Sequence, residues 1–139
     1  MGHMFPDKTA MSKTTQIEFE RLIVVYFQQY KCVLELTDPT FCEDGYITTA
    51  TMTGSGGYVE IRCGPAEYHA ELFVHTLKDQ KRWNLVDLMS VASVRLWMLQ
   101  NRPHTSGRSL LEAEIDYAFC LLVDGLKGVS NFGWLNNKN

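Results

Sequence analysis

The sequence predicts an α+β fold with one N-terminal helix, a three-stranded antiparallel meander and two C-terminal helices packed on one face of the sheet. Apolar residues recur at spacings of three and four in residues 15–30 and 84–126, whereas they alternate with polar residues in residues 46–76. The first spacing is typical of an amphipathic helix, and alternation is typical of a strand with one buried face. Because no helix is predicted between the strands, an antiparallel sheet is expected.

Length, charge and cysteine spacing limit the class of protein. A chain of 139 residues fits one domain, and we expect a tag or disordered N-terminus over 1–11, a single α+β domain over 12–135 and a disordered tail over 136–139. A formal net charge of −3 argues against a nucleic-acid partner. The lack of a long apolar run argues against a membrane partner. The four cysteines lack zinc-like spacing, which favours a cytoplasmic protein with reduced thiols and no cofactor.

The first helix is predicted over residues 15–30. Thr15 and Glu18 have the spacing of a capping box, in which each side chain accepts a hydrogen bond from a free backbone amide. The apolar residues at helical spacing are Phe19, Ile23, Tyr26, Phe27 and Tyr30.

Three strands are predicted at Tyr46–Thr53, Tyr58–Cys63 and Tyr68–Thr76. The connections "GSGG" (54–57) and "GPAE" (64–67) have the length of hairpin loops. If each loop holds four residues, Thr53 faces Tyr58 and Cys63 faces Tyr68.

This register sorts the side chains onto two faces and sets Glu60 opposite Glu71 and Arg62 opposite His69. The apolar face, expected to pack under helices, comprises Thr48, Ala50, Met52, Val59, Ile61, Cys63, Tyr68, Ala70, Leu72 and Val74. The polar face comprises Ile47, Thr49, Thr51, Thr53, Glu60, Arg62, His69, Glu71, Phe73 and His75.

Two helices are predicted after the sheet. The first begins after Asn84, a favourable cap with Asp87 three residues on, and stops at Pro103. It is apolar on nearly all sides, which predicts burial inside the domain or in a homodimer through the Leu85–Leu99 segment. Its expected stripe is Leu85, Leu88, Met89, Ala92, Leu96 and Leu99.

The last helix is predicted to begin at Ser109, with Glu112 at capping-box spacing, and to end near Gly125 or Gly128. Its expected inner face is Leu111, Ile115, Ala118, Phe119, Leu122 and Leu126. The apolar tail residues Phe132, Trp134 and Leu135 are expected to dock back on the domain.

His69, Glu71 and Glu60 form the most compact group of potential metal ligands or acid–base groups. One histidine with two carboxylates could bind iron, manganese or zinc, and two facing carboxylates could share a proton in a hydrolase. However, the positive charge of Arg62 disfavours a cation, His75 lies about 20 Å along the strand from His69, and an open sheet face does not exclude water. We therefore predict a charge-paired surface that has neither a metal nor a catalytic residue.

The polar face is predicted to bind another protein, because Phe73 is an aromatic side chain ringed by polar groups. The candidate contact residues on the sheet are Glu60, Arg62, His69, Glu71, Phe73 and His75. The alternative surface is the acidic side of the last helix, formed by Glu112, Glu114 and Asp116.

The organisation over Thr15 to Leu135 resembles that of bacterial toxin-immunity proteins. The resemblance consists of small size, mild acidity and a one-domain α+β layout, without a shared motif, so no functional residue is carried over. It implies a protein that neutralises a basic toxin domain by occluding its active site. Two alternatives are an acidic secretion chaperone, dimeric and with apolar grooves, and a small enzyme that uses the patch of His69, Glu71 and Glu60.

Overall fold

The computed structural model describes residues 13–44, 47–64 and 69–126, which form an α+β fold. The predictions for residues 1–11, for Tyr46, Tyr68 and for the C-terminal aromatics lie outside the described residues. The helical elements are α1 (Lys13–Leu34), α2 (Leu85–Leu88), α3 (Ala92–Gln100), α4 (Leu110–Cys120) and the π-helical turn η1 (Leu121–Gly125). The strands are β1 (Thr40–Glu43), β2 (Thr48–Gly54), β3 (Gly57–Cys63), β4 (Ala70–Thr76) and β5 (Lys81–Trp83).

Helix α1 has the predicted buried face, but the predicted capping box is wrong. Phe19, Ile23 and Phe27 are fully buried, as their spacing indicates. The helix already includes Lys13, so Thr15 is its third residue and lies buried inside it rather than capping it. Glu18 instead forms a two-pronged ion pair with Arg21, at 2.7 and 2.9 Å.

The sheet has five antiparallel strands in the order β1-β2-β3-β4-β5, where the sequence predicts three. The predicted meander is its centre, and the two missed strands are its edges. β1 has four residues and β5 has three, and both are mostly exposed. Short edge strands with charged residues resist pairing with other chains. Strands of three or four residues are also too short for the alternation of apolar and polar residues to be recognised in the sequence.

The register between β2 and β3 is as predicted, and the register between β3 and β4 is shifted by two residues. Thr53 faces Tyr58, but Cys63 faces Ala70 instead of Tyr68. A shift of two keeps every side chain on its face, because side chains alternate with a period of two. It changes the cross-strand partners, so Arg62 faces Glu71 and Glu60 faces Phe73.

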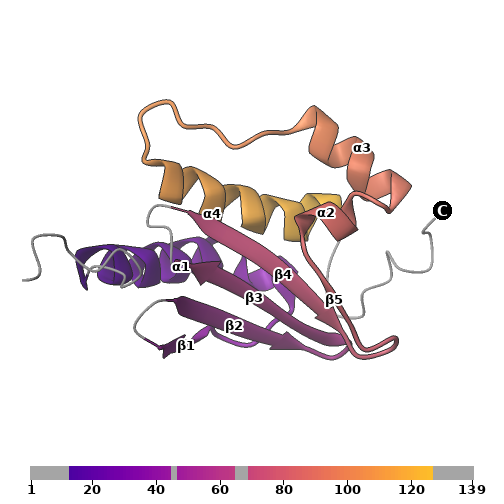
Figure 1. Cartoon of the computed structure of the whole chain (residues 1–139), viewed down its shortest axis with the longest axis horizontal. Coiled ribbons are helices and arrows are strands. Elements are labelled where there is room, and N and C mark those ends of the chain that lie inside the picture. Colours follow the sequence, from indigo (N-terminus) through magenta and orange to yellow (C-terminus); the bar gives the residue numbers. More distant parts are fainter. Residues whose placement is uncertain (1–12, 45–46, 65–68, 127–139) are drawn as a thin grey trace, which may run out of the picture.

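The predicted apolar face of the sheet lies in the hydrophobic core. Ala50, Met52, Val59, Ile61 and Val74 are fully buried. Helices α1 and α4 pack against each other and against β2 and β4, respectively. Figure 1 shows α1 passing behind the strands and α4 lying along the β4 side, so the opposite face of the sheet is left open by the described helices.

The predicted helix between Asn84 and Pro103 is broken in two, which corrects its expected apolar stripe. Asn84 and Asp87 do form a capping box at α2, but the helix stops after four residues. The Ser90 hydroxyl donates to the carbonyl of Asp87 at 2.6 Å, and Val91 is extended, with φ −90° and ψ 118°. Serine competes with the backbone for helical hydrogen bonds and β-branched valine favours extended backbone, which explains the break.

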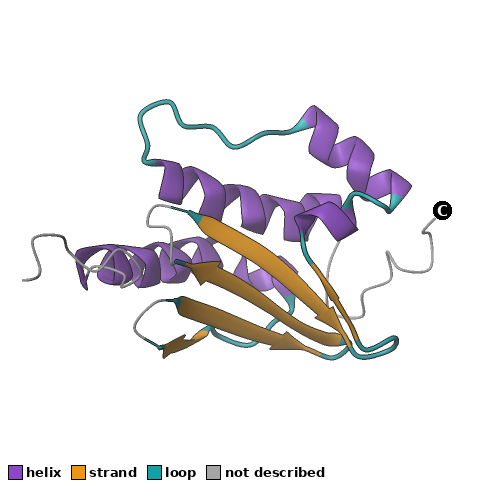
Figure 2. Ribbon diagram, in the orientation of Figure 1, coloured by secondary structure: helices purple, strands orange, loops and turns teal. Residues whose placement is uncertain are grey.

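The break changes which apolar residues are buried. Leu88, Val91 and Val94 reach the core, whereas Leu96 and Leu99 are 57% and 56% exposed. A long coil of residues 101–109 then leads back along α4 to its N-terminus, as Figure 2 shows. No helix within the described ranges is both long and apolar enough to cross a membrane.

Helix α4 and η1 have the predicted inner face. Ser109 caps α4 by accepting a hydrogen bond from the amide of Glu112 at 3.1 Å, although the Glu112 carboxylate binds Tyr26 instead of completing the predicted box. All six expected core residues are buried: Leu111, Ile115, Ala118, Phe119, Leu122 and Leu126. At Gly125 an added Cβ would lie 2.5 Å from the Leu121 side chain and 3.2 Å from the Trp97 ring, so the close approach of α3 and η1 favours glycine.

Candidate functional site

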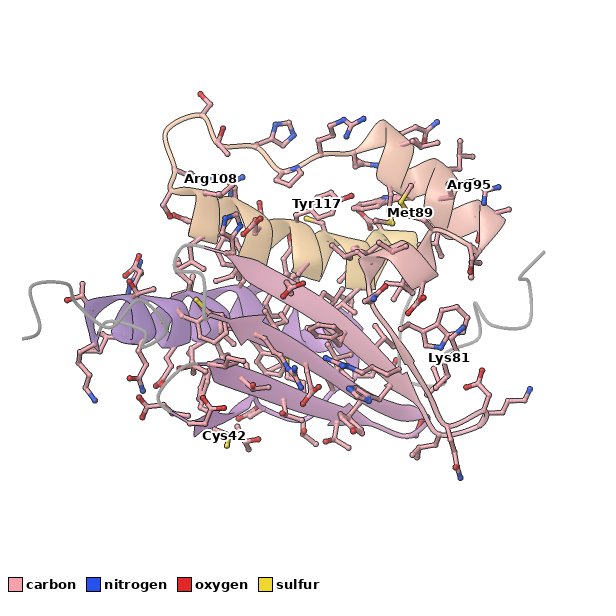
Figure 3. The ribbon with its side chains drawn as sticks, in the orientation of Figure 1. Cys42, Lys81, Met89, Arg95, Arg108 and Tyr117 are labelled. Carbon is pink, nitrogen blue, oxygen red and sulfur yellow. The ribbon has the colours of Figure 1, made fainter. Side chains whose placement is uncertain are left out.

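The open face of the sheet carries a group of interlocked side chains, here called the sheet-face cluster. It spans β3, β4 and β5 and comprises Tyr58, Glu60, Arg62, Phe73, His75 and Arg82. Figure 3 shows polar side chains standing over these strands, on the side that faces away from α1. Five of the six residues belong to the three predicted strands, whereas Arg82 lies on the missed strand β5.

Phe73 is the centre of the cluster, and two arginines cover it. Its exposed fraction is 9%, and the guanidinium carbons of Arg62 and Arg82 lie 5.0 and 3.8 Å from the centre of its ring. Cation–π attraction of this kind holds both guanidinium groups over the aromatic ring. Phe73 therefore lies on the predicted face of the sheet, but two guanidinium groups cover its ring and leave little of it exposed.

A second contact set joins His75, Glu60 and Tyr58. His75 Nε2 lies 2.8 Å from Glu60 Oε1, and the His75 ring stacks on the Tyr58 ring at 4.1 Å and an angle of 10°. The side chains of His75 and Glu60 are 19% and 16% exposed. Both groups are thus fixed within the surface, and Glu60 is engaged by a neighbour within the chain.

The shifted register separates the groups of the enzyme alternative. Glu60 and Glu71 are not cross-strand partners, so the facing pair of carboxylates expected from the sequence is absent from this part of the sheet. His69 lies before the start of β4, and its Nδ1 is 3.5 Å from Glu114 Oε2 on α4. Across residues 13–44, 47–64 and 69–126, no group of three or more His, Cys, Asp or Glu side chains is placed to hold a metal ion.

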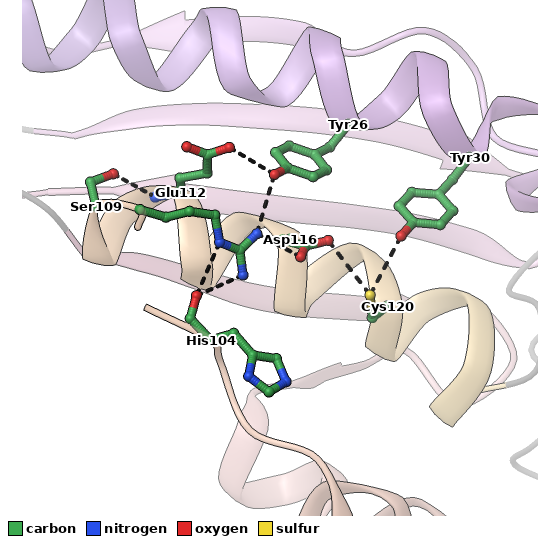
Figure 4. Close-up of polar contacts among 8 residues, drawn as sticks. Tyr26, Tyr30, His104, Ser109, Glu112, Asp116 and Cys120 are labelled. Carbon is green, nitrogen blue, oxygen red and sulfur yellow. Dashed lines mark hydrogen bonds and ion pairs between the residues drawn. The ribbon is translucent and has the colours of Figure 1, made fainter. Parts of the chain in front are cut away.

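The three predicted acidic residues of α4 are held by hydrogen bonds within the chain, and Figure 4 shows those of Glu112 and Asp116. Glu112 accepts from the Tyr26 hydroxyl at 2.8 Å, and Asp116 accepts from Arg108 Nη1 at 2.8 Å. Glu114 accepts from the backbone amide of Ala70 at 2.8 Å. These carboxylates join α4 to α1, to the coil before it and to β4, so they are already used for internal contacts.

The contact between α1 and α4 contains a polar network that the sequence interpretation missed. The Tyr30 hydroxyl and the Cys120 thiol lie 3.5 Å apart, and the thiol lies 3.6 Å from Asp116 Oδ1. A signal was available in the sequence. Tyr26 and Tyr30 are four residues apart on α1, and Glu112, Asp116 and Cys120 repeat every four residues on α4, so each helix presents a polar line to the other.

The pKa values of Cys120 and Tyr30 in this network are both raised. Burial raises the pKa of the Cys120 thiol, and the charge of Asp116 adds to this effect against the hydrogen bond from Tyr30. The hydrogen bond to Cys120 and burial raise the pKa of Tyr30. Because the thiolate is the nucleophile, a raised pKa lowers the reactivity of the Cys120 thiol.

A groove of about 220 Å³ lies between β4, α3 and α4. Its walls are mainly apolar and include Leu72, Leu85, Met98 and Ala118, while Arg102 and Glu114 stand among its polar residues. Tyr117 also lines the groove. The centres of the Tyr117 and Trp97 rings lie 5.5 Å apart, and Figure 3 shows Tyr117 between α4 and α3.

The chain was also compared with known proteins. No protein-family model, curated protein or solved structure matches it. The chemistry of the described surfaces is therefore the basis for assigning a function.

Proposed function

We propose that the chain is a protein-binding domain that contacts its partner through the sheet-face cluster. The supporting observation is the pair of arginines stacked on Phe73 at the centre of an open five-stranded sheet. Arginine and aromatic side chains are enriched among the residues that dominate binding energy in protein interfaces. Because these side chains are already held by their neighbours, little conformational entropy is lost when a partner binds.

The class of function that fits this surface is that of an immunity protein, which neutralises a bacterial toxin domain by covering its active site. An open sheet face whose side chains are already held by their neighbours can cover a cleft without a large conformational change. The net charge of −3 attracts a basic domain over long range and accelerates the encounter. The local contacts are of mixed charge, because the cluster combines two arginines with Glu60 and His75.

The direct test uses the product of the gene immediately upstream as the candidate partner. Arg82→Glu is the main variant, because Arg82 is exposed and its reversal leaves the core intact. We expect it to weaken binding in calorimetry by about thirtyfold or more, as for a central interface residue, and to abolish protection in a growth assay with the toxin. Ile17→Ala changes an exposed side chain of α1, serves as the control and should bind as the wild type does.

Unchanged binding by Arg82→Glu would place the partner elsewhere on the chain. Phe73→Ala provides a second variant, and its fold is checked by circular dichroism, since Phe73 is largely buried. If neither variant changes an affinity that the wild type displays, the sheet-face cluster is not the binding surface.

The groove between α3 and α4 favours a second candidate, an acidic secretion chaperone. Such a protein holds an extended client in apolar grooves and is often a dimer. Leu96 and Leu99 are more than half exposed on α3, and the walls of the adjoining groove are mainly apolar. Exposed apolar surface of this kind is suited to a client segment or to a second copy of the chain.

A further inference from the structure

Two guanidinium groups of the sheet-face cluster lack a full set of acceptors. Arg62 Nη2 lies 3.5 Å from Glu60 Oε1, the same oxygen that contacts His75 at 2.8 Å. Arg62 Nε is buried and has no hydrogen-bond partner among the described residues. Within the same described ranges, the Arg82 side chain makes no hydrogen bond or ion pair and contacts the Phe73 ring. A guanidinium has five N–H donors, so both groups have donors to offer a ligand.

The position of the two groups is set by the sheet. β3 and β5 lie on either side of β4, so Arg62 and Arg82 approach the Phe73 ring from opposite neighbouring strands. Stacking on the ring orders side chains that would otherwise sample many rotamers. A ligand that accepts hydrogen bonds from both groups therefore meets preorganised donors.

The nearby carboxylates do not neutralise this pair. Glu60 is shared with His75 through one oxygen. Glu71 faces Arg62 across the strands but makes no ion pair with it or with any other described residue. Glu71 is therefore the internal competitor for any anion that binds here.

We infer that Arg62 and Arg82, with Phe73 between them, bind the carboxylate of an aspartate or glutamate side chain presented by the partner. The inference rests on the proposed function and deepens it, by naming the chemistry at the centre of the contact. A guanidinium and a carboxylate match in shape and can form two parallel N–H···O bonds. A protein partner supplies carboxylates, and the net charge of −3 disfavours polyanions such as nucleic acid.

The experiment uses the full chain labelled with ¹⁵N-arginine, in which NMR follows the side-chain Nε–Hε signals. The probe is N-acetyl-aspartate N-methylamide, which carries one carboxylate, and the matched neutral probe is N-acetyl-asparagine N-methylamide. We expect saturable shifts of the Arg62 and Arg82 signals with the carboxylate alone, while the Arg95 and Arg102 signals on and after α3 do not saturate.

Three variants test which residues determine the affinity for the carboxylate probe. Arg82→Gln should weaken binding of the carboxylate probe by about fivefold, as expected for loss of a charge-assisted hydrogen bond. Glu71→Gln should strengthen it by about twofold, because the competing carboxylate is removed. Arg102→Gln, at an exposed position outside the sheet, should leave the affinity unchanged.

Three results would overturn the inference: shifts at Arg62 and Arg82 that match those at Arg102, equal responses to the neutral probe, or saturation by inorganic phosphate alone. The test does not use the partner, so its failure leaves partner binding by the sheet open. Conversely, a chain that binds the carboxylate probe but protects against no toxin would retain the site and lose the proposed function.

Discussion

Arg108 joins three separate parts of the described chain. Its Nε and Nη2 donate to the carbonyl of His104 at 3.0 and 2.6 Å, and its Nη1 donates to Asp116 and to the Tyr26 hydroxyl. One side chain thus joins the coil of residues 101–109, the middle of α4 and the middle of α1. In Figure 4 the dashed lines from Tyr26, Asp116 and the carbonyl of His104 meet at one guanidinium group.

Replacing Arg108 should therefore destabilise the fold more than replacing another arginine of the same coil. Arg108→Met keeps the aliphatic length but leaves Asp116 and the His104 carbonyl without their donor, with an expected loss of about 1–3 kcal/mol of unfolding free energy. Arg102→Met, at an exposed position, should stay within about 0.5 kcal/mol of the wild type. Urea unfolding followed by circular dichroism measures both, and equal losses would contradict the bridging role of Arg108.

The raised pKa values of groups on α4 and on the facing side of α1 predict alkaline destabilisation. The pKa values of Tyr26, Tyr30, Tyr117 and Cys120 are all raised in the folded chain, with burial as a cause in each. These groups are neutral when protonated, so their contribution to stability is fully present below the ordinary values of 9.0 for Cys and 10.0 for Tyr. Above those values the unfolded chain releases the protons first, and stability is lost as the pH rises toward the folded pKa.

Tyr30→Phe tests this pH dependence. The variant removes one of the titrating groups, so its urea midpoint should fall less than that of the wild type between about pH 8 and about pH 11. A fall as steep as that of the wild type would show that Tyr30 is not linked to stability in this range. The absolute stability of the variant at neutral pH is a separate quantity, which reports the lost contact with Cys120.

At the scale of elements, α2 depends on its cap more than a longer helix would. It has only four residues, and Asn84 and Asp87 satisfy amides that the helix itself cannot. Asn84→Ala should cost about 1 kcal/mol, since it removes the acceptor for the Asp87 amide. Val86→Ala, at a side chain that is 77% exposed, is the control within the same element and should change little. Thermal melts compare the two, and an equal shift in Tm would rule out the cap as the reason why α2 forms here.

The elements also differ in how well their sequences predict them. Helix α4 repeats large apolar residues every three or four positions with few β-branched interruptions, so its inner face is correctly predicted through Leu126. The segment from Leu85 to Gln100 has the same apolar content, but Ser90 and Val91 break it. The choice between one helix and two is decided by local hydrogen bonds at Asp87 and by what each half can bury. The spacing of apolar residues indicates neither these hydrogen bonds nor the burial of each half.

At the scale of the whole molecule, the two proposed functions predict different oligomeric states. The immunity-protein proposal expects a monomer of 15.9 kDa, because the sheet faces the partner and both sheet edges are short. The chaperone alternative expects a dimer through α3. Size-exclusion chromatography with light scattering distinguishes them, and Leu96→Lys should dissociate such a dimer while leaving a monomer unaffected.

In the candidate site too, the pattern within each strand predicts which face a side chain lies on, whereas its partners depend on contacts between strands. Alternation predicted that Glu60, Arg62, Phe73 and His75 share the open face, and a register shifted by two residues preserves that result. The partners of each side chain depend on the loop between β3 and β4, whose length in the folded chain the sequence does not reveal. Arg82 was missed because β5 has three residues, too few for a period to be recognised.

The sequence by itself determined the fold class, the two faces of the sheet and the inner faces of α1 and α4. These features follow from the spacing of apolar residues, which fixes the direction of each side chain within its own element. Only the tertiary structure decided the β3–β4 register, the edge strands, the break before α3 and the arginines that cover Phe73. Those features depend on contacts between segments far apart in the chain, where the free energy of packing and hydrogen bonding selects among arrangements that local propensity leaves nearly equal.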